Sequence, residues 1–269
     1  YKHFTDERFY NHFLTCLDID KFRDYKIKLY SPRVSVICSS NRVANLHIVV
    51  DNFNKQVYEN KELLICVNLD EKDVDMSIVR KYELNKNTRI IRLDDEHTLG
   101  YCLNALVDRS TGDIIQKMDD DDYYSENFIK NQVMTYDIYN ADLVGKSCYF
   151  TFIRNTRSLY IRKYRKNLGS IYANSVHGGT VSFLRRHNLV FGNSNQGEDT
   201  ELIVSAMRRQ LSIVNSNVFD YCYVRHGDVN EHSWKITNAD LIDEKRDMFI
   251  EECDSIPTSI VGGRLMSWK

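Results

Sequence analysis

The chain has 269 residues, of which 42% are hydrophobic and 28% are charged. That composition is typical of a globular protein and excludes a wholly disordered chain, and the length allows one or two domains. Lys and Arg number 36 against 38 Asp and Glu, so the net charge is −2. This balance argues against a dedicated nucleic-acid-binding protein, and no apolar run approaches the roughly 20 residues of a membrane-spanning helix.

The seven cysteines are scattered and form no C-x-x-C motif. Thiols in apolar runs are typical of core residues in a reducing compartment, so we expect a cytoplasmic protein. A basic and aromatic stretch at residues 154–166 contains no acidic residue. We interpret it as a solvated hairpin, and the alternative is contact with an anionic acceptor or with the inner face of a membrane, as a peripheral protein.

Strands and helices alternate along the first half of the chain. Apolar, β-branched runs predict strands at 34–38, 63–67, 89–93 and 114–118. Apolar residues three and four apart predict helices between them, at 43–57 and 99–107. This order is typical of an α/β fold with a mostly parallel central sheet flanked by helices. The expected domain spans 31–235, with a helical lead-in at 1–30 and a helical tail at 236–269.

Four consecutive aspartates, Asp119 to Asp122, follow the predicted strand that ends at Met118. Ligands of open parallel sheets bind at the carboxyl ends of the strands, so chemistry is expected here. Alternate side chains of an extended chain share a face, which points Asp119 and Asp121 the same way. Two hard carboxylates suit Mg²⁺ or Mn²⁺ that also holds a diphosphate, whereas a solvated acidic loop is the plainer interpretation.

From Pro32 to about Trp234 the sequence resembles the family 2 glycosyltransferases, which have the Rossmann-like GT-A fold. The resemblance rests on several pieces in the family's order: 32–37, 56–65, 99–104, 111–115 and 118–122. The last piece matches the D-x-D metal motif as Asp119-x-Asp121. The resemblance implies an inverting, metal-dependent transfer of a sugar from a nucleotide-diphosphate donor, expected to be UDP-linked. The implied acceptor is a hydroxyl of a glycan, glycopolymer or glycolipid in cell-surface or spore-surface polysaccharide synthesis.

The resemblance also implies roles for individual residues. The Mn²⁺ or Mg²⁺ ion would be held by Asp121 and Asp119, with His226 as a third ligand. The nucleotide and donor would be bound by polar residues and a close-approach glycine at the strand ends: Ser39, Asn41, Arg42, Asn68, Gly100, Asn104, Asp119, Asp120 and Arg225. The donor and acceptor pocket would include Gly178, Gly179 and Trp234.

Two positions depart from the family pattern. Asn68 stands where the family often has an Asp pair that binds the base, and Leu103 stands where it often has Arg. An Asn side chain can also hydrogen-bond a base edge, so Asn68 stays in the expected site while the base itself is left open.

A second acidic pair, Glu198 and Asp199, precedes a predicted helix with Leu202, Ile203 and Ala206 on one face. The helix dipole favours an ionised carboxylate at this position, as a general base requires, although Asp is also a common helix cap. Members of the resembling family place their base in a matching Glu-Asp motif. We therefore expect Asp199 to be the catalytic base, with Glu198 as the second choice.

Two other functions are open from the residues. A sugar-phosphate nucleotidyltransferase also uses an acidic metal site on an α/β sheet. It usually has a Gly-rich phosphate loop after its first strand, and residues 38–42 contain no Gly. A catalytically inactive module of the same fold would instead bind a glycan or a partner protein. The intact set of Asp119, Asp121 and Asp199 argues against the inactive module, and the missing Gly argues against the nucleotidyltransferase.

Overall fold

The computed structural model describes most of the chain from Ser31 to Gly263. The described ranges are 31–70, 72, 74, 76–83, 87–163, 172–225, 241–243 and 247–263. The expected lead-in at 1–30 and the predicted site residues His226 and Trp234 lie outside them. Within these ranges, no helix combines the length and the apolar character needed to cross a membrane.

A seven-stranded sheet with the order β10-β6-β9-β4-β1-β2-β3 forms the centre of the fold. Its strands are β1 (Val34–Ser40), β2 (Lys61–Asn68), β3 (Thr88–Leu93), β4 (Ile114–Lys117), β6 (Leu143–Gly145), β9 (Ser182–Leu184) and β10 (Ile213–Asn215). The pairs β1–β2, β2–β3, β1–β4 and β6–β10 are parallel, and only β9 runs antiparallel to its neighbours β4 and β6. The predicted strands and the mostly parallel sheet are therefore confirmed.

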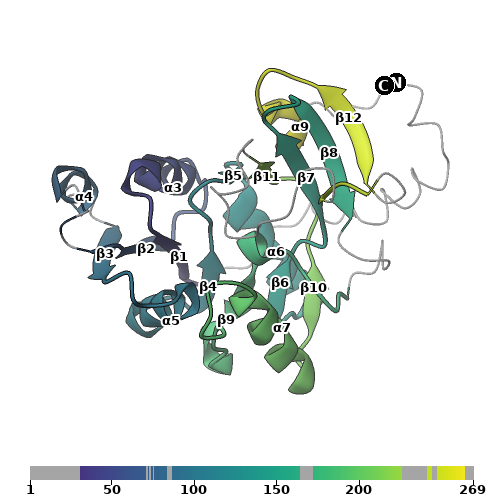
Figure 1. Cartoon of the computed structure of the whole chain (residues 1–269). Coiled ribbons are helices and arrows are strands. Elements are labelled where there is room, and N and C mark those ends of the chain that lie inside the picture. The colour runs from purple at the N-terminus through teal and green to yellow at the C-terminus, as the bar shows by residue number, and fades with distance from the viewer. Residues whose placement is uncertain are drawn as a thin grey trace.

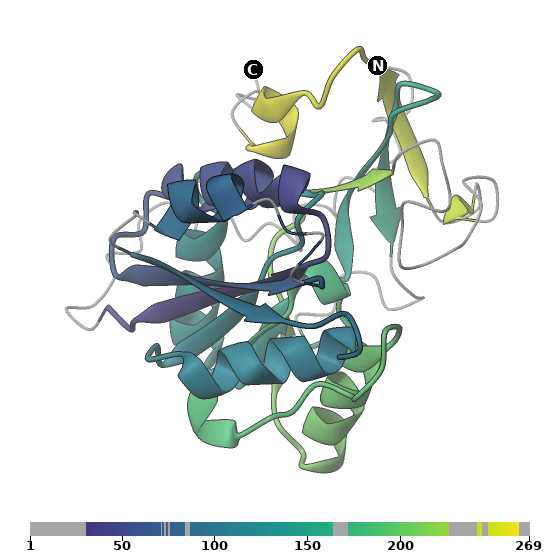
Figure 2. The ribbon, with the colours of Figure 1, turned by 60° about the vertical axis from the view of Figure 1, so that its left-hand side comes forward.

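Helices cover both faces of this sheet (Figures 1 and 2). One face packs against α3 (Leu46–Asn54), α4 (Met76–Glu83) and α6 (Phe128–Tyr139), and the other against α5 (Leu99–Arg109) and α7 (Glu198–Arg208). Successive residues of β1 show why: Val36 joins the core on the α3 side and Ile37 joins the core on the α5 side. The helix predicted at 43–57 is shorter than expected, because Val43–Asn45 forms a 3₁₀ turn before α3.

A second sheet with the order β12-β8-β7-β11-β5 packs beside the first (Figure 1). Its strands are β5 (Tyr123–Tyr124), β7 (Cys148–Ile153), β8 (Ser158–Lys163), β11 (Tyr221–Arg225) and β12 (Met248–Glu252). Strand β12 differs from the helical tail expected at 236–269. The described part of that tail also contains one short helix, α9 (Thr258–Val261). Met248 and Ile250 pack on the core of this sheet, and their alternation is a strand signal.

The basic stretch predicted to be a hairpin is one in its described part. Residues 154–157 are exposed and join β7 to β8, which are paired antiparallel. No disulfide joins the cysteines that the structure describes, and Cys38, Cys66, Cys102 and Cys222 are buried as core residues.

The acidic run 119–122 connects the two sheets. It follows β4 of the first sheet and precedes β5 of the second. The run therefore lies where the carboxyl end of a central parallel strand meets a different layer.

Candidate active site

A cavity of about 990 Å³, called the site cavity below, opens at the carboxyl ends of β1, β2 and β4. This is the edge of an open α/β sheet at which ligands bind. Most of the predicted site residues line it: Ser39, Asn41, Arg42, Asn68, Asp119, Asp120, Asp121, Gly178, Gly179, Glu198 and Asp199.

Burial alternates along the acidic run. Asp119 and Asp121 are half-buried, whereas Asp120 and Asp122 are 5% and 2% exposed. The alternation expected for an extended chain is therefore present in the burial, although residues 120–122 are bends and not strand. The two carboxylates expected to act together, Asp119 and Asp121, are thus the more open pair.

Arg42 holds the middle of the run in place. Its guanidinium donates to both Asp120 oxygens and, over 2.9 Å, to Oδ2 of Asp121. Ser40 Oγ donates a further hydrogen bond of 2.5 Å to Asp120. Asp120 is therefore a buried, fully engaged carboxylate that fixes the loop after β1 to the loop after β4.

The fourth carboxylate, Asp122, faces the second sheet. It accepts hydrogen bonds from Tyr221 Oη at 2.5 Å and from the backbone N–H of Val224 at 2.9 Å. Burial, together with the charges of Asp121 and Asp119, raises the pKa of Asp122 well above its ordinary value. Asp122 anchors the run to β11.

Asp121 is the carboxylate of the run whose surroundings most favour a bound cation. Burial and then the neighbouring Asp120 raise its pKa to about 6, even though Arg42 lies beside it. Hard carboxylate oxygens at a cavity wall fit Mg²⁺ or Mn²⁺, which take one or two carboxylates and complete their shell with substrate phosphates. Within the described ranges no group of three His, Cys, Asp or Glu lies close enough together to hold a metal ion.

Lys117 is a site residue that the sequence interpretation missed. Its side chain is 6% exposed, and its Nζ lies 2.5 Å from Oδ1 of Asp119 and 3.9 Å from Oε1 of Glu198. Burial lowers the pKa of Lys117, but Asp119, Glu198 and Asp199 outweigh this and raise it. The sequence did contain a signal for Lys117, because this lysine ends an apolar strand and lies two residues before Asp119. Lys117 links the two acidic motifs through one cation.

Asp199 lies in the first turn of α7 and lines the site cavity. Glu198 beside it is 5% exposed, and burial raises its pKa in spite of Lys117. The more open Asp199 is the better placed of the two to meet a substrate hydroxyl.

The Gly178–Gly179 pair lets the chain pass between the acidic motifs. A Cβ on Gly178 would lie 1.7 Å from Oδ2 of Asp199, and a Cβ on Gly179 would lie 2.8 Å from Oδ2 of Asp119. Tyr124 Oη, which accepts from the Asp119 N–H, donates to the Gly179 carbonyl over 2.7 Å. The absence of side chains at these two positions therefore keeps the predicted base and the predicted metal carboxylate facing one cavity.

Three predicted donor-binding residues do not line the site cavity. A Cβ on Gly100 would lie 1.7 Å from the Gly192 carbonyl oxygen, so Gly100 serves the close approach of α5 to that loop. The Asn104 amide exchanges two hydrogen bonds with the backbone of Phe191. Arg225 is fully buried and donates to Tyr223 Oη over 3.1 Å. All three hold elements together in this structure.

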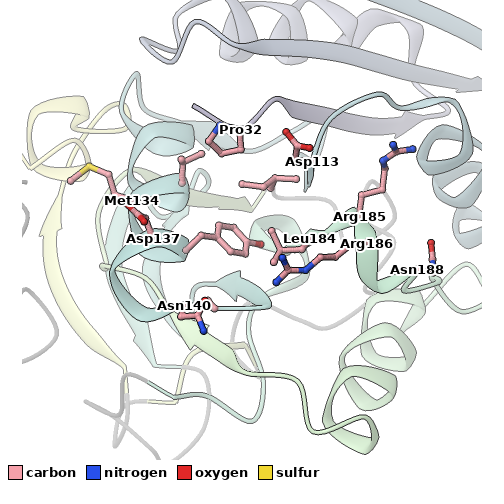
Figure 3. Close-up of a pocket in the computed structure, with 13 residues that line it drawn as sticks. Pro32, Asp113, Met134, Asp137, Asn140, Leu184, Arg185, Arg186 and Asn188 are labelled. Carbon is pink, nitrogen blue, oxygen red and sulfur yellow. The ribbon is translucent and has the colours of Figure 1, made fainter. Parts of the chain in front are cut away.

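A second cavity, of about 700 Å³, lies at the opposite edge of the sheet (Figure 3). It is bordered by Pro32 and Asp113, which precede β1 and β4, and by Arg185 and Arg186 after β9. Two of its charged groups have partners, since Arg186 lies 3.7 Å from Asp142 and Asp113 accepts from the Arg33 N–H over 2.9 Å. This cavity contains none of the predicted site residues.

Comparison with known proteins gives one family. The model of the family described as "Glycosyl transferase family 2" matches residues 35–192, more than half of the chain. No curated protein sequence matches the chain.

Solved structures with the same fold are distant in sequence. TarS residues 1–349 from S. aureus, in complex with UDP-GlcNAc, is 16% identical with a TM-score of 0.56, over 72% of this chain and 58% of that one. The mannosyltransferase PcManGT from Pyrobaculum calidifontis, in complex with GDP-Man and Mn²⁺, is 17% identical with a TM-score of 0.54, over 81% and 66%. The chain spans less than two thirds of either relative. These likenesses confirm the expected GT-A fold.

Proposed function

The chain belongs to glycosyl transferase family 2, and on that premise we propose that it transfers a sugar from a nucleotide-diphosphate donor to an acceptor hydroxyl with inversion at the anomeric carbon. The observation that carries this proposal is the meeting of two acidic motifs, 119–121 and 198–199, on one cavity at the carboxyl ends of parallel strands. Each motif alone has a plain structural explanation. Their convergence on either side of Gly178 and Gly179 is what a transferase needs.

The nucleotide would lie over β1 and β2. Ser39, Asn41 and Asn68 place hydroxyl and amide groups on that wall of the cavity. The amide nitrogen of Asn68 donates to the Asp94 carbonyl over 2.6 Å, which fixes the side chain for contact with a base edge. We propose a UDP-linked donor, and because the structural neighbours bind UDP-GlcNAc and GDP-Man, both nucleotides belong in its test.

The diphosphate would lie over the acidic run. Asp121 and Asp119 would hold Mn²⁺ or Mg²⁺, and His226, which lies outside the described ranges, stays a proposed third ligand. When bound, the divalent ion supplies the positive charge that stabilises a leaving diphosphate. Arg42 keeps Asp120 and Asp121 in place from the protein side.

Asp199 would perform the proton transfer. Its carboxylate removes the proton from the acceptor hydroxyl as that oxygen attacks the anomeric carbon from the face opposite the diphosphate. One carbon–oxygen bond forms as the bond to the phosphate oxygen breaks, which inverts the configuration. Lys117 keeps the surrounding carboxylates compensated with positive charge.

The proposed acceptor is a hydroxyl of a glycan, glycopolymer or glycolipid. The transfer would be a step in the synthesis of a cell-surface or spore-surface polysaccharide. The family match and the exposed basic turn at 154–157, which joins two strands of the second sheet, support this proposal. A cytoplasmic enzyme with peripheral contact to the inner membrane face is part of the same proposal.

Calorimetric titration tests the donor assignment. We expect UDP to bind the chain in Mn²⁺ and to bind at least about 100-fold more weakly to Asp121→Ala, since changes in the outer shell of a metal site alone cost about 10–100-fold. Asp254→Ala is the matched control, because Asp254 is an exposed partner of Arg157 and does not line the site cavity. Two results contradict the proposal. One is that UDP and GDP each bind Asp121→Ala as tightly as they bind wild type, and the other is that wild type binds neither nucleotide.

A further inference from the structure

His177 lies at the wall of the site cavity and is anchored on both sides by its backbone. Its N–H donates to the Lys146 carbonyl over 2.8 Å, and its carbonyl accepts from the N–H and the hydroxyl of Thr180 at 2.9 and 2.8 Å. The residue therefore has a fixed position at the entry to the Gly178–Gly179 pair.

Three tyrosine rings surround the imidazole. The ring centroids of Tyr149, Tyr223 and Tyr221 lie 4.4, 5.2 and 5.5 Å from that of His177. Such packing restricts the side chain to one orientation. Burial lowers the pKa of His177 to about 3, so the ring is neutral at physiological pH.

A hydrogen-bonded chain fixes which ring nitrogen carries the proton. Tyr221 Oη gives its single proton to Asp122, so towards His177 Nδ1, 3.0 Å away, it can only accept. On this direction of the chain we assign the hydrogen to Nδ1 and the lone pair to Nε2. Among the described residues, the hydrogen bonds that involve this ring are made through Nδ1 alone.

The position of His177 relative to the two acidic motifs indicates what it meets. Gly178 abuts Asp199 and Gly179 abuts Asp119, so the segment 177–179 runs between the proposed base and the proposed diphosphate site. In a direct displacement the attacking and leaving oxygens lie on opposite sides of the anomeric carbon, so the transferred sugar would lie in the site cavity over this segment.

We propose that His177 binds the transferred sugar, with Nε2 accepting a hydrogen bond from a sugar hydroxyl or amide N–H. This inference rests on the proposed function and names a specificity residue within it. A lone pair in a fixed place selects for a hydrogen on the sugar at that position and against a deoxy position, since an unmet acceptor at a buried site costs binding. Asp122 and Tyr221 act as positioning residues for the ring.

Matched substitutions separate the two ring nitrogens. His177→Asn keeps an amide N–H that can reach Tyr221 and removes the atom at the Nε2 position, whereas His177→Gln keeps an acceptor near the Nε2 position. His177→Phe keeps the ring packing and removes both nitrogens. Thermal unfolding of each variant shows which of them are folded, and any folded member of the set can decide the question.

Affinities are measured by calorimetry in Mn²⁺ with UDP-GlcNAc, UDP, GDP-Man and GDP. For the base that wild type prefers, we expect His177→Asn and His177→Phe to bind the nucleotide sugar about tenfold more weakly and the nucleoside diphosphate within about twofold of wild type, a loss of one hydrogen bond to a buried group. We expect His177→Gln to recover at least part of the loss.

Two results overturn the assignment and leave the proposed function standing. One is an equal loss for nucleotide sugar and nucleoside diphosphate, which places His177 at the phosphates or in the scaffold. The other is unchanged nucleotide-sugar affinity in the folded variants. Failure of wild type to bind any of the four ligands overturns the proposed function itself, together with this inference.

Discussion

Buried carboxylates have opposite surroundings at the two edges of the central sheet. The amino edge is the one at which the parallel strands begin, and the carboxyl edge is the one at which they end. At the amino edge, Glu62 accepts hydrogen bonds from the hydroxyl of Ser35 and from the N–H and hydroxyl of Thr111 at 2.6 to 2.8 Å, and Arg89 lies 2.8 Å away. Burial raises the pKa of Glu62, but these hydrogen bonds outweigh it and the pKa is lowered. Every oxygen there has donors, which is the condition of a structural carboxylate.

At the carboxyl edge, carboxylates crowd one another instead. Asp121 shares Arg42 with Asp120, and its pKa is raised to about 6. The difference teaches that the charge of Glu62, which holds the sheet together, is fully compensated, whereas the charge of Asp121, which faces the site cavity, is not. Incomplete compensation is the state that a cation or a proton can relieve.

The largest expected effect is on chemistry at the carboxyl edge. Asp199→Asn removes the proposed base and keeps the shape of the side chain, so we expect turnover to fall about 10²–10⁴-fold with donor affinity unchanged. Turnover is measured as nucleoside diphosphate released in the presence of acceptor. Glu198→Gln, in the same helical turn, is the control and should cost less. Full turnover by Asp199→Asn would show that the base lies elsewhere.

The next effect is on stability at the amino edge. Glu62→Gln removes the charge that accepts the Ser35 and Thr111 hydrogen bonds and that Arg89 and Arg33 share, and we expect the free energy of unfolding at pH 7 to fall by about 2 kcal/mol, since both guanidinium groups are half exposed. Because the folded pKa of Glu62 is lowered, its stabilisation is complete above the unfolded pKa of about 4.3 and is lost as the pH falls through the folded value. Urea unfolding at pH 7 and in acid checks both statements. A drop in turnover per folded molecule would break the contrast between the edges.

Asp121→Asn should change stability in the opposite direction. The folded pKa of about 6 lies above the unfolded value of about 3.9, so wild type loses stability as the pH rises from about 4 to 6. We therefore expect Asp121→Asn to be more stable than wild type by about 1–3 kcal/mol at pH 8 in a chelator, and equal to it near pH 4. Melting temperatures across this pH range measure it, with Asp254→Asn as the exposed control. A destabilised Asp121→Asn at pH 8 would mean that Arg42 compensates the charge completely.

The smallest effect is expected in the second cavity. Arg186→Ala removes a side chain that is 70% exposed and 3.7 Å from Asp142, so the free energy of unfolding should change by less than about 1 kcal/mol. Donor affinity and turnover should stay at the wild-type level. A loss of turnover in Arg186→Ala would show that the amino-edge cavity takes part in the function.

Much of the fold could be predicted from local pattern. Each of the four strands from Val34 to Lys117 contains a short apolar, β-branched run, and the structure confirms each strand. Strand β12 could not be predicted as easily, because its partner β8 lies far away in the sequence and its alternation is short. A pairing of that kind depends on tertiary contact more than on propensity.

The site was partly predictable for a related reason. The aspartates at 119–121 and the pair at 198–199 can be recognised as motifs in the sequence. Both motifs line the site cavity. Lys117 and His177 carry no motif, and only the fold shows that they lie beside the aspartates. Gly100, Asn104 and Arg225 were expected at the donor, and the structure gives them packing partners that a linear sequence does not reveal.

The four aspartates look interchangeable in the sequence and are not so in space. Asp120 is tied to the loop after β1, Asp122 to β11 of the second sheet, and only Asp119 and Asp121 are left half-open. If the run shifted by one position relative to its neighbours, an aspartate would still stand at most of its positions. The aspartates that are now anchored would then take the half-open positions. Insertion of one neutral residue between Met118 and Tyr123 would therefore keep all four negative charges and still disturb how the run connects the two sheets.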